Sequence, residues 1–318
     1  MRAVQITEFG GPEVVVVRDD VPEPVAGPGE VLVEVARSGV NFADTLMREN
    51  GYITAATLPL VPGGEVVGTA ADGRRLAAMT ERGGYAERAV VSEGYAFEVP
   101  DDLDDVSAVA LLAQGLTAWW LVNHTGRVRP GDSVVVHAAA GGVGSLAVQL
   151  ARLAGAGRVI ATASAQDKRD LAVSLGADAA VDPAEDDLTA ALCAANGGKP
   201  VDVVLEMTGG RVTDQSVAAL APFGRLAFYG MAGGVAPTPV EPRELQRGSA
   251  TVSGFWLIHA FARRDVLTAA YAEMAKQVAS GQLRVVRGGD FPMSQVREVH
   301  AELAGRRTTG KLVLDPRR

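Results

Sequence analysis

Reactive and metal-binding side chains are scarce in this chain of 318 residues. The sequence has one cysteine, Cys193, and four histidines. A single cysteine excludes an intrachain disulfide and any zinc site built from several cysteines. The histidines form no pattern that resembles a Ser-His-Asp triad. The chemistry of this protein therefore has to come from other groups or from a cofactor.

An excess of positive charge is also absent. The chain carries 30 Lys and Arg against 38 Asp and Glu, a formal net charge of −8. This balance argues against a nucleic acid or an anionic membrane as the main partner. The N-terminal stretch "MRAVQITEFGGPEVV" lacks the apolar segment of a signal peptide. The most apolar window, residues 107–122, is interrupted by Gln114 and Gly115 and is shorter than a membrane span. We expect a soluble, cytoplasmic protein.

Two kinds of periodicity divide the chain. Residues 1 to about 100 contain short β-branched runs separated by Gly and Pro, such as "EVVVVRDD" and "GEVLVEVARSGV", and this spacing predicts a β-rich, partly barrel-like unit. From about 130 to 250, strand-like and helix-like segments alternate, which predicts a parallel, doubly wound sheet. The second unit therefore appears as an insertion between two parts of the first, and we expect a ligand in the cleft between them.

The stretch "VVVHAAAGGVGSLAVQLARLAG" (134–155) is close to a dinucleotide-binding fingerprint. Ala139, Gly141 and Gly144 stand where G-x-G-x-x-G has its glycines, so the first glycine is missing. A strand leads in and a helix leads out, which is the context that the fingerprint requires. Gly141 and Gly144 would let the backbone approach a pyrophosphate and the helix pack closely, and the helix N-terminus would bind the anion. The extra methyl of Ala139 fits if its φ is negative.

The next strand bears on which dinucleotide is bound. NAD sites usually place Asp or Glu at the end of this strand to bind the ribose 2′-hydroxyl, but "RVIATASAQDK" has Ala163 and Ser164 there. Ser164 and Lys168 are therefore candidates to bind a 2′-phosphate, with Arg169 as a second basic candidate. This pattern favours NADPH. Alternatively, Lys168 and Arg169 are a solvated helix face.

Six motifs in order resemble a known family. They are "RSGVNFADTLMRENGY", "LPLVPGGEVVG", "LLAQGLTAWWLV", "HAAAGGVGSLAVQLAR", "LGADAAVD" and "TTGKLVL". Over essentially the whole chain, the sequence resembles the medium-chain dehydrogenase/reductase superfamily, specifically its zinc-free, zeta-crystallin-like quinone oxidoreductases. This resemblance implies an α/β protein in which a β-rich GroES-like catalytic domain (1–115 and 253–318) carries an inserted Rossmann domain (116–252).

The resemblance also bears on metal. Zinc-dependent relatives have Cys, His and Cys at three catalytic-metal positions, which match Asn41, Gly64 and Gln114 here. None of these is a thiolate or imidazole ligand, and the cysteine-rich lobe of those relatives is absent. We therefore predict no metal. Glu65, which follows Gly64, is a single carboxylate and does not by itself make a site.

The implied activity is hydride transfer from NADPH to a quinone or another α,β-unsaturated carbonyl compound, whose conjugation takes up the charge. By resemblance, the catalytic residues are Asn41, Asp44 and Tyr52, although Asn41 and Asp44 are equally explained as a helix cap. The cofactor-binding residues implied in the same way are Asn41, Thr117, Gly141, Gly142, Val143, Gly144, Ser164, Lys168, Gly230, Met231, Phe255, Trp256, Leu257 and Lys311.

One departure concerns the third strand of this unit. Where many quinone reductases have Tyr after the residue that ends this strand, this chain has Asp182-Pro183. Because proline has no N–H to donate, we expect a weaker preference for NADPH than is usual in the family.

Two other functions remain open. A 2-enoyl thioester reductase is suggested by "ENGY" and by "GFWLIHAF", and it would need positive charge for a coenzyme A or carrier-protein arm. Arg263 and Arg264 are candidates for that charge, although a solvated helix start explains them better. The other alternative is a sensor that binds NADPH without turnover. The apolar segment "ATVSGFWLI" is expected to be an edge strand, and by resemblance it would pair in a homodimer.

Overall fold

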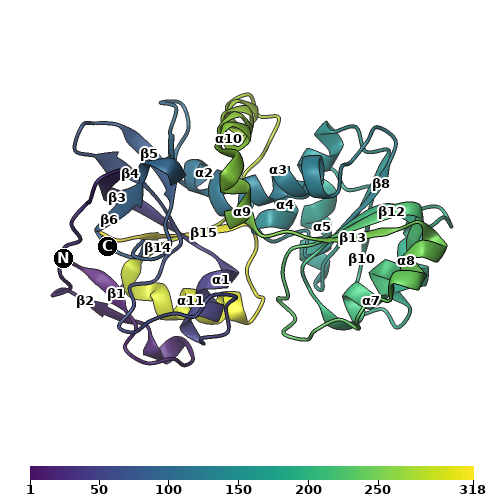
Figure 1. The fold of residues 1–318 in the computed structure, drawn as a ribbon, viewed down its shortest axis with the longest axis horizontal. Coiled ribbons are helices and arrows are strands. Elements are labelled where there is room, and N and C mark those ends of the chain that lie inside the picture. The colour runs from purple at the N-terminus through teal and green to yellow at the C-terminus, as the bar shows by residue number, and fades with distance from the viewer. The chain divides into compact units, whose positions relative to one another are not determined.

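The computed structural model describes residues 1–318 and consists of two compact units (Figure 1). Unit 1 comprises Met1–Leu116 and Phe261–Arg318, and unit 2 comprises Thr117–Ala260. The first division falls next to the predicted position 115. The second falls at Ala260 rather than at residue 252, because strand β13 (Thr251–Gly254) and the short helix α9 (Leu257–Ala260) belong with the sheet of unit 2. This division differs from the predicted start of the C-terminal part at 253.

Unit 1 is rich in β-structure, as its sequence predicted. Its main sheet has the order β14-β15-β3-β4-β5-β7, with β6 also paired to β3, and all of these pairs are antiparallel except β14 with β15. The strands are β3 (Glu30–Val40), β4 (Glu65–Ala70), β5 (Arg75–Met79), β6 (Arg88–Ser92), β7 (Ala96–Glu98), β14 (Arg287–Pro292) and β15 (Lys311–Asp315). A separate two-stranded sheet pairs β1 (Ala3–Gln5) with β2 (Val16–Arg18).

The helices of unit 1 contribute to one of its hydrophobic cores. They are α1 (Phe42–Arg48), α2 (Asp105–Ala110), α10 (Arg264–Ala279) and α11 (Val296–Ala304), with single turns η1 (Pro12–Val14), η2 (Glu93–Tyr95), η5 (Phe261–Arg263) and η6 (Met293–Gln295). One core gathers Val33, Val35 and Val66 from the alternating faces of β3 and β4. The other packs Val296 and Val299 of α11 against Leu312 and Leu314 of β15.

Unit 2 is a doubly wound α/β unit with one parallel sheet. The strands are β8 (Ser133–Val136), β9 (Arg158–Thr162), β10 (Ala179–Val181), β11 (Val201–Glu206), β12 (Leu220–Phe228) and β13, in the order β10-β9-β8-β11-β12-β13. Its helices are α3 (Thr117–Trp120), α4 (Gly142–Leu153), α5 (Gln166–Ser174), α6 (Leu188–Ala195), α7 (Gly210–Ala218), α8 (Pro242–Gly248) and α9. The parallel sheet predicted from the alternating pattern is confirmed.

The order of these strands fixes where unit 2 can bind a ligand. Counted along the chain within the unit, the strand order is 3-2-1-4-5-6, so the winding reverses between β8 and β11. In open parallel sheets of this kind, ligands bind outside the carboxyl ends of the strands at the reversal point. The turn that follows β8 carries the fingerprint region, and it therefore lies at the expected place.

One helical stretch, with a kink at Leu112, covers Asp105–Thr125. It runs through α2, a π-helical segment η3 (Leu111–Leu116), α3 and a second π-helical segment η4 (Leu121–Thr125). By length and composition it would be able to cross a membrane, with a mean hydropathy of 1.4, but 78% of its most apolar window is buried inside the protein. This burial is typical of a core helix.

Candidate functional site: a nucleotide-binding edge and a buried polar cluster

The turn after β8 is built for close packing of backbone against backbone. The positive φ of this turn falls on Ala138, at 49°, and not on Ala139. Ala139 is fully buried, and its N–H donates to the carbonyl of Thr162 at 3.0 Å. The methyl group of Ala139 is therefore accommodated under the condition that the sequence analysis set.

Two glycines of the fingerprint have distinct roles in this turn. Gly141 is the N-cap of α4, and no side chain caps the first N–H groups of that helix. A helix start without a cap presents N–H donors and a positive dipole end to an anion. Gly144 lies against the preceding turn, where a Cβ atom would come within 2.3 Å of the Ala138 carbonyl oxygen and 2.7 Å of the Ala139 Cα. The residues present fit a dinucleotide pyrophosphate, which would lie along Gly141, Gly142, Val143 and Gly144.

The end of β9 carries the residues predicted to select the nucleotide. Ser164 is exposed two residues after the strand, and Lys168 is half-buried in the first turn of α5. Arg169 is not a freely solvated side chain: its Nη1 donates to the carbonyl of Ala163 at 2.8 Å and to the Asp182 carboxylate at 2.9 Å. The assignment of Ser164 and Lys168 to a 2′-phosphate stays a prediction.

Most of the other predicted cofactor residues of unit 2 follow β12 and β13, on the far side of the reversal point. Gly230 and Met231 come after β12, and Met231 is 43% exposed. Phe255 continues the pairing beyond β13 through its N–H to the Phe228 carbonyl, and its ring stacks on Trp120. The remaining three predicted residues lie in helical segments or next to them: Thr117 begins α3, Trp256 precedes α9 and Leu257 begins it. Their contact with a nicotinamide stays a prediction.

In unit 1, Asn41 lies between β3 and α1, where it forms hydrogen bonds with the side chains of Asp44 and Glu65. The Asp44 carboxylate accepts the backbone N–H of Asn41 at 2.8 Å, so Asp44 supports the start of α1 as a capping residue does. Asn41 is itself the N-cap residue of α1 and forms a capping box with Asp44. Its Nδ2 also donates to Glu65 Oε1 at 2.7 Å. The helix cap expected from the sequence therefore holds for both residues, and Asn41 belongs in addition to a polar cluster.

Glu65 is the centre of this cluster. Its carboxylate is completely buried and forms an ion pair with the ammonium of Lys311, which is 1% exposed. The second carboxylate oxygen accepts the backbone N–H of Ala113 at 2.9 Å. The carboxylate fits against β3 because position 39 is glycine: a Cβ there would lie 2.3 Å from Glu65 Oε1.

The hydrogen bonds of the cluster fix the orientation of two amides. Because Asn41 Nδ2 donates to Glu65, Asn41 Oδ1 faces the opposite direction, where it accepts from Gln114 Nε2 at 3.1 Å and from Lys311 Nζ at 3.4 Å. The structure thus brings together Asn41 and Gln114, two of the three positions that match zinc ligands in zinc-dependent relatives. They bond to each other, and Asn41 also accepts from the ammonium group of Lys311. This set of donors does not suit Zn²⁺, which prefers thiolate, imidazole and carboxylate ligands.

Sequence reasoning gave incomplete roles to three members of this cluster. The ammonium of Lys311, predicted to bind the cofactor, is held by Glu65 and Asn41, and its contact with the cofactor stays a prediction. Glu65 was left without a role because its partner is 246 residues away in the chain. Gln114 was considered only as a lost metal ligand. Tyr52, the third predicted catalytic residue, is half-buried in the turn region after α1.

Asp44 also belongs to a second buried network, which includes Tyr85, His300 and Arg48. Tyr85, which is fully buried, donates its hydroxyl to Asp44 at 2.9 Å, and its ring meets the edge of His300. Arg48, 1% exposed, donates to the Gly10 carbonyl and lies 3.4 Å from Nδ1 of His300. Burial raises the pKa of Asp44 to about 6. Burial and the nearby Arg48 charge lower the pKa of His300 to about 3.

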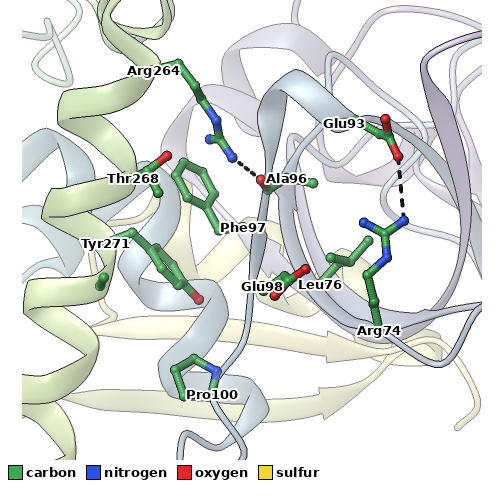
Figure 2. A pocket seen from close by; sticks show the side chains of 11 residues that line it. Arg74, Leu76, Glu93, Ala96, Phe97, Glu98, Pro100, Arg264, Thr268 and Tyr271 are labelled. Carbon is green, nitrogen blue, oxygen red and sulfur yellow. Dashed lines mark hydrogen bonds and ion pairs between the residues drawn. The ribbon is translucent and has the colours of Figure 1, made fainter.

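Arg264 departs from the prediction of a solvated helix start. It lines a pocket of about 350 Å³ in unit 1, where its guanidinium lies 3.9 Å from the centroid of the Phe97 ring and donates to the Ala96 carbonyl (Figure 2). In this arrangement, the face of the Phe97 ring and the carbonyl of Ala96 stabilise the positive charge of Arg264. Arg263 is exposed and pairs weakly with Asp265. The pocket lies between α10 and β7, with Tyr271 and Pro100 among its walls.

Taken together, a parallel sheet with a glycine-rich turn at its reversal point and a β-rich unit with buried polar groups define a nucleotide-dependent dehydrogenase or reductase. Family models agree with this class: residues 27–77 match an alcohol dehydrogenase GroES-like domain, and residues 142–277 match a zinc-binding dehydrogenase domain.

Three comparisons identify the family more closely. The chain is 34% identical to a quinone oxidoreductase of Pseudomonas aeruginosa, over 99% of both chains, and 32% identical to a 2-haloacrylate reductase of a Burkholderia species, over 99% of this chain and 98% of that protein. Among solved structures, the quinone oxidoreductase of Thermus thermophilus, described with its NADPH complex, is 38% identical with a TM-score of 0.87, covering 99% of this chain and all of the other. The chain belongs to the quinone oxidoreductase family of the medium-chain dehydrogenases/reductases.

The packing of Gly144 predicts a specific loss of stability. Gly144→Ala would force the turn at Ala138 to move, and overpacking of this kind costs about 1–3 kcal/mol. We expect the free energy of unfolding in urea to fall by that amount. Gly248→Ala is the matched control in the same unit, because its Cβ would make only an ordinary contact at 3.6 Å. If the Gly144 variant and the wild type have equal free energies of unfolding, the turn at Ala138 moves without a measurable cost, which contradicts the prediction.

The shifted pKa values of Asp44 and His300 predict opposing effects of pH on stability. Asp44 has a native pKa above its ordinary value of 3.8, so the folded state binds more protons between about pH 4 and 6 and stability falls as pH rises there. His300 has a native pKa below its ordinary 6.5, so the unfolded state binds more protons between about pH 3 and 6.5 and stability rises with pH there. The two contributions oppose each other between about pH 4 and 6.

Single substitutions separate these two contributions. We expect Asp44→Asn to make the free energy of unfolding rise more steeply with pH than in the wild type between pH 4 and 6. His300→Gln should make it rise less steeply or fall, and each difference approaches at most about 1.4 kcal/mol per pH unit. Urea unfolding at half-unit steps of pH measures both slopes. Parallel curves for all three proteins would contradict the assigned pKa shifts.

Proposed function

We propose that this protein is an NADPH-dependent, metal-independent oxidoreductase that transfers hydride to a quinone or another α,β-unsaturated carbonyl compound. The observation that carries the proposal is the uncapped start of α4 at the reversal point of the sheet, in a chain whose Thermus relative was solved with NADPH. NADPH, when bound, supplies the hydride. The protein's own residues bind it, orient it and orient the acceptor.

The nucleotide would be held at the carboxyl edge of unit 2. The N–H groups of Gly142, Val143 and Gly144 face the pyrophosphate in this proposal, and the helix dipole of α4 stabilises its charge. Ser164 and Lys168 bind the 2′-phosphate. Thr117, Gly230, Met231, Phe255, Trp256 and Leu257 border the nicotinamide half.

Asn41, Asp44 and Lys311 take positioning roles in this proposal. Asp44 fixes the backbone of Asn41, and the Glu65–Lys311 pair fixes its amide. Tyr52 is then the residue that we assign to donate a hydrogen bond or a proton to the oxygen of the acceptor. An acceptor that is already conjugated carries the developing charge itself, so this chemistry needs no Lewis acid.

Independence from metal is supported by the side chains at the three metal positions. Asn41 and Gln114 are amides bonded to each other, and Gly64 has no side chain. The matched family model is called zinc-binding, but the ligand types that zinc requires are not present at these positions.

The activities for which relatives are named support the acceptor class. Several are quinone oxidoreductases, and the Burkholderia relative is a reductase of 2-haloacrylate, an acid whose double bond is conjugated to the carboxyl group. A homodimer through the edge strand β13, which pairs only with β12, completes the proposal.

The test is oxidation of NADPH followed by its absorbance, with NADH as the control. We expect fast turnover with a simple 1,4-quinone and little with a short enoyl-CoA, because Arg264 is engaged with Phe97 and Ala96 rather than available to an arm's phosphates. Preference for the enoyl-CoA would move the assignment to thioester reduction. Binding of NADPH without oxidation by any acceptor would leave only the sensor function.

For Tyr52, the matched substitution is Tyr52→Phe. We expect a fall in kcat with the preferred acceptor, because the ring stays and only the hydroxyl is removed. An unchanged kcat would show that Tyr52 positions the acceptor by packing and does not donate a proton or a hydrogen bond.

A further inference from the structure

The ends of β9 and β10 form the part of unit 2 where a 2′-phosphate would be recognised. In a sheet of this order, the residue at the end of the second strand reads the ribose 2′ position. Arg169 lies at that place, because its Nη1 donates to the carbonyl of Ala163, the residue that follows β9. A guanidinium group is well suited to a phosphate, which it binds in a bidentate manner.

Arg169 is already engaged by a carboxylate. Its Nη1 lies 2.9 Å from Oδ2 of Asp182, the residue that follows β10, and its Nη2 donates to Gln166 Oε1 at 3.1 Å. The two side chains of the ion pair are only 17% and 31% exposed, so the pair is partly shielded from solvent. Asp182 is itself held in place, since its Oδ1 accepts the N–H of Ala184 at 2.9 Å.

This pair affects the two nucleotides differently. A 2′-phosphate placed at the end of β9 would meet the negative charge of Asp182 and would compete with it for Arg169. A 2′-hydroxyl carries no charge and would meet neither penalty. An ion pair that is partly shielded from solvent interacts more strongly than a fully exposed one. The contact is therefore strong enough to alter the selectivity between nucleotides.

We infer that Asp182 sets the nucleotide selectivity of this protein by holding Arg169 away from the 2′-phosphate of NADPH. The inference rests on the proposed function, since it concerns the same nucleotide site. It assigns Arg169 as a latent phosphate ligand and Asp182 as the residue that restrains it. Selectivity for NADPH over NADH is then lower than the basic side chains alone would give.

The test compares binding of NADP⁺ and NAD⁺, which differ only in the 2′-phosphate, by isothermal titration calorimetry at low salt. In Asp182→Asn, we expect the affinity for NADP⁺ to rise about fivefold, which corresponds to about 1 kcal/mol. The affinity for NAD⁺ should stay within about twofold, and the gain should shrink at high salt because the charges are screened.

Two further variants distinguish the release of the Arg169 side chain from the general effect of removing a negative charge near the nucleotide. Asp167→Asn is the matched control, because Asp167 is an exposed carboxylate of the same helix α5 that does not pair with Arg169. It should change the ratio of the two affinities by much less than Asp182→Asn. In the double variant Asp182→Asn with Arg169→Gln, the gain for NADP⁺ should disappear.

Each possible result either supports or overturns the inference. A gain that requires Arg169 supports the inference. An unchanged ratio in Asp182→Asn, or a gain that persists without Arg169, overturns the inference and leaves the proposed function intact. If the wild type binds neither nucleotide, the proposed function fails and the inference fails with it.

Discussion

The buried ion pair between Glu65 and Lys311 is the interaction on which the organisation of unit 1 depends. It joins the first residue of β4 to the first residue of β15, and through hydrogen bonds it also holds Asn41 at the start of α1 and Ala113 in η3. A buried pair of this kind has a large desolvation cost, so removal of one partner leaves an uncompensated charge, at a cost of about 3–5 kcal/mol. The pair is therefore a strict constraint on how these four segments meet.

That constraint also acts on two positions that match metal ligands in zinc-dependent relatives. The amides of Asn41 and Gln114 lie in one hydrogen-bonded row that ends at the carboxylate of Glu65. This row fixes the orientation of the Asn41 side chain. In unit 2, the uncapped start of α4 and the close packing of Gly144 suit a dinucleotide.

The periodic parts of the sequence predicted the fold well. Alternating strands and helices predicted the parallel sheet of unit 2, and the position of the fingerprint after β8 followed from local pattern alone. The division at Ala260 differs from the predicted bound at 252, because β13 and α9 are short and carry no distinct boundary signal. Gln114 and Gly115, which interrupt the apolar window 107–122, lie in a π-helical segment.

The partners of the polar residues were much harder to predict. Lys311 and Glu65 are 246 residues apart, and Arg48 and His300 are 252 apart, so no local pattern connects them. Arg169 was recognised as a basic candidate and Asp182 as a departure from the family, but only the structure pairs them. For the same reason, the helix-cap role of Asp44 was foreseeable from its spacing to Asn41, whereas its contact with Tyr85 was not.

The central claim is that this member of the family reduces its acceptor without a metal, and metal content measured together with activity tests it most directly. Zinc per chain would be determined by mass spectrometry on the same samples whose NADPH oxidation rate with a quinone is measured, before and after treatment with a chelator. The account predicts far less than one zinc ion per chain and an unchanged rate. About one zinc ion per chain, with activity lost on chelation and restored by zinc, would contradict it.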